Sequence, residues 1–171
     1  MHRVTKPIFA GLALLCVTAC TATPLYQPSQ GQTASNAVYA QSIAFAAPKN
    51  RVGQVVRNKV IFQLYGGSSE PANAALQGSF SVNASTADAF RTSTTSIGQT
   101  SAAVITVSGT LTVTDTATGE VVETIRRSAI APIDKGNQQF ATERAVLDAQ
   151  NRAGEELGEQ FATLLASRIL R

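Results

Sequence analysis

A strictly alternating segment constrains the fold of this chain more than any other feature. From Ile105 to Thr114, every odd position holds an apolar residue or glycine, and every even position holds serine or threonine. Side chains of a β-strand point alternately to opposite faces of the sheet. The segment therefore predicts a strand with one apolar face, which another layer must cover, and one hydroxyl face turned to water or to a partner.

Three further segments carry strand patterns. After a turn at Asp115–Gly119, where glycine permits an unusual backbone conformation, Val121–Ile130 returns as the second strand of a hairpin. Earlier in the chain, Gly78–Ser85 alternates between small or apolar residues and polar residues. Ile43–Ala46 is a short apolar stretch. Together with the alternating segment, these predict four strands.

Two segments carry helical spacing instead. Arg51–Tyr65 places valines three and four residues apart, between Asn50, a favourable N-cap residue, and Gly66, a typical helix stop. Asn137–Leu170 has a charged face opposite an apolar stripe. That stripe contains Val146, Ala153, Leu157, Phe161 and Leu164, widened by Leu165 and Ile169. A helix of about 34 residues would reach roughly 50 Å, more than a compact sheet requires.

The order strand, helix, three strands, long helix predicts an α+β fold. We expect a two-layer sandwich, in which two helices pack on one face of a mainly antiparallel four-stranded sheet. The helices should cover the apolar side formed by Ile105, Val107, Leu111 and Val113.

The N-terminus carries the pattern of an export signal. His2, Arg3 and Lys6 form a basic start, and the apolar run Ile8–Val17 is too short for the roughly 20 residues that span a bilayer. The next residues, Val17-Thr18-Ala19-Cys20, resemble the lipobox of bacterial lipoproteins. We therefore interpret residues 1–19 as a lipoprotein signal peptide, residues 20–42 as a lipidated tether and residues 43–171 as the folded domain.

Cys20 is the predicted lipidation site. Bulky Leu15 precedes Cys16, so Cys16 does not fit the lipobox and should be discarded with the signal. Each buried acyl CH₂ contributes about 0.8 kcal/mol, and more than one chain gives a firm anchor. Thr21, rather than an aspartate, follows the cysteine, which favours sorting to the outer membrane. We expect a lipid-anchored protein on the periplasmic side of that membrane.

Composition excludes several kinds of chemistry. The single histidine, His2, leaves with the signal, and the two cysteines are discarded or lipidated. The mature chain then lacks the groups needed for His-based acid–base catalysis, Cys–His nucleophiles and ordinary zinc sites, and we expect no cofactor and no metal. Removal of Arg3 and Lys6 also leaves nearly balanced charge, which does not fit a nucleic-acid-binding surface. A carboxylate pair such as Glu155 and Glu156 remains a formal enzymatic alternative, but we predict that the protein is not an enzyme.

Several ordered motifs resemble the LptE family of lipopolysaccharide-assembly lipoproteins, in its alphaproteobacterial form. The resemblance covers most of the mature chain. It rests on Cys20-x-x-x-Pro24-Leu25-Tyr26, Arg51-x-Gly53-Gln54-x-x-Arg57-Asn58, Asp115-x-x-Thr118-Gly119, and the tail Phe140-Ala141…Asp148-Ala149-x-x-Arg152-Ala153-x-Glu155-Glu156-Leu157.

The resemblance implies a non-catalytic plug inside the outer-membrane β-barrel LptD. There it would help to assemble the barrel and assist the insertion of lipopolysaccharide at the cell surface. Because lipopolysaccharide carries phosphates, basic residues near loops are candidate contacts. These are Arg91, Arg126, Arg127 and Lys135.

Another kind of lipoprotein remains an alternative interpretation. A periplasm-facing scaffold could activate a peptidoglycan synthase or serve an ABC-transport system. A scaffold of this kind would likewise have a lipid anchor and a domain without catalytic groups.

Overall fold

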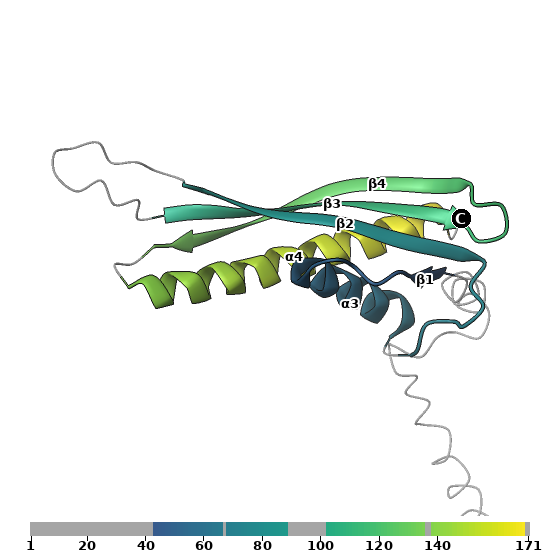
Figure 1. The fold of residues 1–171 in the computed structure, drawn as a ribbon, viewed down its shortest axis with the longest axis horizontal. Helices are drawn as coiled ribbons and strands as arrows, with labels where there is room; N and C mark the ends of the chain where they lie inside the picture. Colours follow the sequence, from purple (N-terminus) through teal and green to yellow (C-terminus); the bar gives the residue numbers. More distant parts are fainter. Residues whose placement is uncertain (1–42, 67, 89–101, 136–137, 170–171) are drawn as a thin grey trace, which may run out of the picture. The chain divides into compact units, whose positions relative to one another are not determined.

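The computed structural model describes residues 43–66, 68–88, 102–135 and 138–169. All of these lie in one compact unit, Ala34–Arg171. The proposed signal and tether, Cys20 and Arg91 lie outside the described residues. The described chain forms four strands and two helices, in the order β1, α3, β2, β3, β4, α4 (Figure 1).

The four strands form a mixed, mostly antiparallel sheet in the order β1-β2-β3-β4. β1 (Ile43–Phe45) runs parallel to the start of β2 (Leu76–Asp88). β3 (Ala102–Asp115) is antiparallel to both β2 and β4 (Val121–Asp134). The predicted strand at 121–130 is four residues longer in the structure, because residues up to Asp134 pair with the first residues of β3.

The two helices occupy one side of this sheet, as the sequence predicted (Figure 1). α3 (Arg51–Tyr65) begins where the Asn50 side chain accepts a hydrogen bond from the Gly53 N–H, 2.7 Å away. It ends at Gly66, whose left-handed backbone (φ 59°) lets its N–H reach the Phe62 carbonyl. Both predicted caps are confirmed. α4 (Gln139–Ile169) is a single helix of 31 residues.

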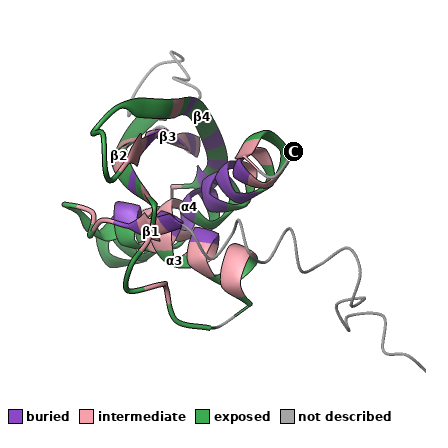
Figure 2. Cartoon of the chain, turned by 90° about the vertical axis from the view of Figure 1, so that its right-hand side faces the viewer, coloured by how far each residue is buried: buried purple, intermediate pink, exposed green. Residues whose placement is uncertain are grey.

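The core lies between the sheet and the helices. The apolar face of β3 is fully covered, with Ile105, Val107, Leu111 and Val113 each 0% exposed. Figure 2 shows buried residues along β3 and in both helices. From α4, Ala153, Leu157 and Phe161 fill the same layer, and from α3, Val56 and Val60. The α+β two-layer sandwich predicted from the sequence is confirmed.

Glycines on α4 allow α3 to approach it closely. A Cβ at Gly158 would lie 2.9 Å from the Val56 carbonyl oxygen and 2.7 Å from Lys59 Cβ. A Cβ at Gly154 would meet Val55 at 3.2 Å. The interface therefore depends on the absence of a side chain, most strongly at Gly158.

The hairpin between β3 and β4 contains a β-bulge. Val113 pairs with Glu123 and Thr114 with Val121, which leaves Val122 as the extra residue. The bulge explains why two adjacent valines interrupt the alternation in this strand. Asp115 closes the turn, since its Oδ1 accepts hydrogen bonds from the N–H groups of Ala117 (2.8 Å) and Thr118 (2.9 Å). These bonds, led by that from Thr118, lower the pKa of Asp115.

Within the part of the chain that the structure describes, no helix is both long and apolar enough to cross a bilayer.

Candidate functional site: the hydroxyl face of the sheet

The face of the sheet opposite the helices carries a band of small polar side chains. The β2–β3–β4 register aligns them in rows that cross the strands. Neither described helix packs on this face (Figure 1). The rows are Ser79–Thr112–Thr124, Ser81–Thr110–Arg126 and Asn83–Ser108–Ser128.

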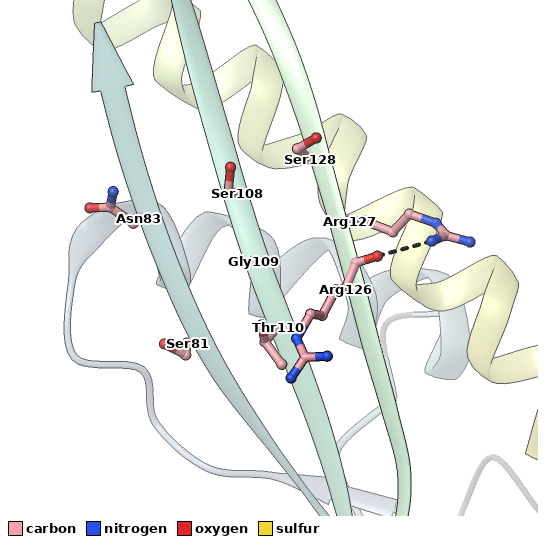
Figure 3. Close-up of a pocket in the computed structure, with 8 residues that line it drawn as sticks. All are labelled: Ser81, Asn83, Ser108, Gly109, Thr110, Arg126, Arg127 and Ser128. Carbon is pink, nitrogen blue, oxygen red and sulfur yellow. Dashed lines mark hydrogen bonds between the residues drawn. The ribbon is translucent and has the colours of Figure 1, made fainter.

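A hollow of about 620 Å³ lies on this face. It is bordered by Ser81, Asn83, Ser108, Gly109, Thr110, Arg126, Arg127 and Ser128 (Figure 3). A second hollow of about 350 Å³ shares Ser81 and Thr110 with it and reaches Lys49 beyond β2. The two hollows form a polar path across the strands, with a cation at each end.

Many polar groups on this path are available to a ligand. Within the described residues, the side chains of Ser81, Asn83, Ser108 and Thr110 form no hydrogen bond. The Arg126 guanidinium likewise has no carboxylate or hydrogen-bond partner there. Hydroxyl groups that both donate and accept, together with a guanidinium that donates, suit an anionic ligand rich in hydroxyls.

Arg126 and Arg127 point in different directions although they are adjacent. Arg126 pairs with Thr110 and lies on the hydroxyl face, where Figure 3 shows its side chain beside Thr110. Arg127 pairs with Gly109, which is buried on the helix side. Its guanidinium turns back over the strand edge and donates to the Arg126 carbonyl at 2.9 Å. Arg126 alone of the two therefore reaches into the hollow.

Lys135, another sequence-predicted contact, does not lie beside Arg126. Lys135 lies nine residues beyond Arg126, about 30 Å along a strand, and forms an ion pair with Asp88. Arg91 lies outside the described residues. Arg126 and Lys135 therefore do not belong to one cluster, because Arg126 lies within β4 and Lys135 follows its last residue.

Sequence reasoning missed Lys49 and the β2 residues of the hollow. Lys49 precedes a helix, and nothing near it in the sequence indicates a binding surface. Ser81 and Asn83 were visible as the polar half of an alternating strand. Their position beside Arg126 depends on the strand order.

The alternative carboxylates lie elsewhere. Glu155 and Glu156 are exposed on α4, on the other side of the sheet from the hydroxyl face. Glu156 accepts a hydrogen bond from Gln160 at 3.3 Å. Neither borders the two hollows described above.

Several solved lipoproteins share this fold. A putative lipoprotein from Caulobacter crescentus superposes with a TM-score of 0.62 at 22% identity, covering 80% of this chain and 96% of that chain. Rare lipoprotein B from Shewanella oneidensis gives a TM-score of 0.54 at 11% identity, with 74% and 92% covered. A minor lipoprotein from Acinetobacter baumannii gives 0.53 at 10% identity, with 73% and 88% covered. At these identities the likeness establishes the fold.

No protein-family model matches the sequence, and no curated protein does so either.

Proposed function

We propose that this protein is a non-catalytic lipoprotein of the outer membrane that plugs and helps to assemble the lipopolysaccharide-translocating barrel LptD. The observation that carries the proposal is the broad hydroxyl face, on which neither described helix packs, of a domain whose fold recurs in solved lipoproteins. The lumen of a large outer-membrane barrel is polar. The serine, threonine and asparagine side chains of this face can form hydrogen bonds with such a wall, and the Arg126 guanidinium can pair there with an anionic group.

We assign the contact with lipopolysaccharide to the same face. A guanidinium binds phosphate through two parallel hydrogen bonds, and the surrounding hydroxyl groups can bond to sugar hydroxyls. Arg126 is the residue we assign to the phosphate. Lys49 lies at the far end of the polar path, where a second anionic group could bind.

Purification of the full-length, tagged protein from detergent-solubilised membranes tests the assembly role. A large outer-membrane β-barrel should co-purify, and depletion of the protein should hold lipopolysaccharide in the inner layers of the envelope. Normal surface lipopolysaccharide after depletion would contradict the proposal. Capture of a peptidoglycan synthase or a transporter without a barrel would support the scaffold alternative instead.

Arg126→Ala tests the ligand contact. Loss of one charge-assisted pair should weaken binding of purified lipopolysaccharide about tenfold, because such bonds contribute about 1.5 kcal/mol or more. Arg127→Ala is the matched control, since its guanidinium points out of the hollow. Equal losses in the two variants would show a general charge effect rather than a site on this face.

A further inference from the structure

The hydroxyl face changes from polar to apolar along the strands. The three rows that cross it at Thr124, Arg126 and Ser128 hold only polar side chains. The next row, Ser85–Thr106–Ile130, contains an isoleucine, and the row after it, Ala87–Val104–Pro132, is apolar throughout. Polar and apolar side chains are thus separated on this face rather than mixed.

The apolar side chains at this end lie next to one another. We call Ala87, Val104, Ile130 and Pro132 the apolar patch. Val104 and Pro132 are opposite each other on neighbouring strands, where side chains are about 5 Å apart. Ile130 precedes Pro132 by two residues, about 7 Å along the same strand and on the same face. Ile130 is 62% exposed, and Ala87 and Pro132 are also exposed. Asp134 stands in the next row and ends the patch.

The apolar patch adjoins the hollow that contains Arg126. Ser128, which borders this hollow, lies on β4 between Arg126 and Ile130 (Figure 3). The opposite end of the face is different. Val121 is 59% exposed there, but it pairs with Thr114, and the row at Thr124 separates it from the hollow. The face therefore has a direction, from a guanidinium through hydroxyl and amide groups to aliphatic side chains.

We propose that the apolar patch binds the acyl chains of an anionic glycolipid whose phosphate binds at Arg126. This inference rests on the proposed function, and it adds a subsite and an orientation. Burial of the patch against acyl chains removes apolar surface from water. Ile130 is four residues from Arg126, about 13 Å along the strand, so the ligand would lie lengthwise along β4.

The order of groups on the face favours a glycolipid as the occupant. Phosphate, sugar and acyl chain follow one another in such a ligand, as the guanidinium, the hydroxyl and amide groups and the patch do here. An apolar segment of a protein would match the patch but not the polar groups that adjoin it. Because the patch is only two rows long, it would contact the part of the acyl chains next to the sugar.

Two forms of one ligand test the acyl subsite on the full-length protein. Purified lipopolysaccharide is compared with the same material after alkaline removal of its acyl chains, in one detergent. Ile130→Thr removes apolar surface and keeps the β-branched shape that suits a strand. It should weaken binding of the intact ligand about fivefold, because part of a buried isoleucine contact is lost. Binding of the deacylated ligand should not change.

Val121→Thr is the matched control. It makes a similar change at a similarly exposed position on the opposite end of the face, and it should alter binding of neither form. Equal effects of Val121→Thr and Ile130→Thr would overturn the orientation. Equal weakening of both ligand forms by Ile130→Thr would show that this residue does not act through the acyl chains.

Arg126→Ala separates this inference from the proposed function. It should weaken binding of both forms, because sugar and phosphate remain after deacylation. If Arg126→Ala weakens both forms and Ile130→Thr weakens neither, the acyl subsite is wrong while the phosphate contact stands. If Arg126→Ala changes neither, the phosphate contact is wrong and the inference falls with it. Equally tight binding of phosphatidylglycerol, which has chains and a phosphate but no sugar, would overturn the choice of a glycolipid.

Discussion

Tyr65 shows how one residue joins elements that are distant in the sequence. Its hydroxyl donates to the Ile43 carbonyl, which ties the end of α3 to the start of β1. Burial, and after it the negative charge of Glu70, raise the pKa of Tyr65 to about 12. The neutral phenol is thus the form that the folded protein prefers.

This pKa predicts a loss of stability at high pH. An unfolded tyrosine ionises near pH 10, whereas the folded one stays neutral until about pH 12. The Tyr65 contribution to the free energy of unfolding should be complete below pH 10 and decrease as pH rises from 10 to 12. Urea denaturation across this range measures it.

Tyr65→Phe provides the control for that measurement. The variant should lose about 1 kcal/mol at pH 8, where the hydrogen bond is removed. Its stability should fall less steeply than the parent's between pH 10 and 12. Parallel curves for the two proteins would mean that the pKa of Tyr65 is the same in the folded and the unfolded protein.

Individual residues were predictable from sequence only where they act locally. Asn50 and Gly66 cap a helix through neighbours three or four residues away, and both predictions are confirmed. Arg57 and Glu70 bond to Phe45, 12 and 25 residues distant, and nothing in the sequence indicates that pairing. Helix caps depend on residues close in the sequence, whereas hydrogen bonds between distant residues depend on the fold.

At the scale of elements, the packing of α3 on α4 depends on glycine. Helical periodicity predicted both helices but gave no reason for Gly154 and Gly158 within the longer one. The reason lies in the interface: at Gly158 the α3 backbone approaches too closely for a side chain, and at Gly154 the Val55 side chain leaves little room.

Gly158→Ala should therefore destabilise the protein although alanine favours helices. Alanine gains up to about 1 kcal/mol in helix propensity. The contact at 2.9 Å with the Val56 carbonyl oxygen forces the helices apart, and such overpacking costs typically about 1–3 kcal/mol. We expect a net loss of about 1–2 kcal/mol in the free energy of unfolding, measured by urea denaturation.

Gly154→Ala is the comparison for this change. Its Cβ would meet a Val55 methyl at 3.2 Å, a side-chain contact that can yield by a few tenths of an ångström. The stability that this contact costs in Gly154→Ala should be nearly offset by the gain in helix propensity. If both variants were equally stable, the helix interface would be more adaptable than the structure indicates.

The whole molecule combines a predicted anchor with a domain that has a polar and an apolar side. The anchor lies outside the described residues and stays a prediction. Cys20→Ala should abolish lipid attachment and release the chain from membranes, because anchoring depends on burying acyl chains. Cys16→Ala should change neither, because Cys16 lies within the segment predicted to be removed. Intact-mass measurement of the membrane and soluble fractions distinguishes the two results.

The proposed contact surface also belongs to this scale. The basic residues chosen from the sequence are separated in the structure, with Arg126 on the hydroxyl face and Lys135 held by Asp88. The hollow instead combines Arg126 with hydroxyl and amide side chains of three strands. Such a set forms only when strands distant in the chain are placed side by side.

The sequence alone determined the type of each element and which residues of β3 face the core, because both follow from spacings of two, three or four residues. The tertiary structure decided that β1 lies parallel beside β2, and that Arg126 and Ser81 border one hollow. Those features arise from contacts between residues tens of positions apart. Their energies depend on the packing of the whole domain, which no local pattern contains.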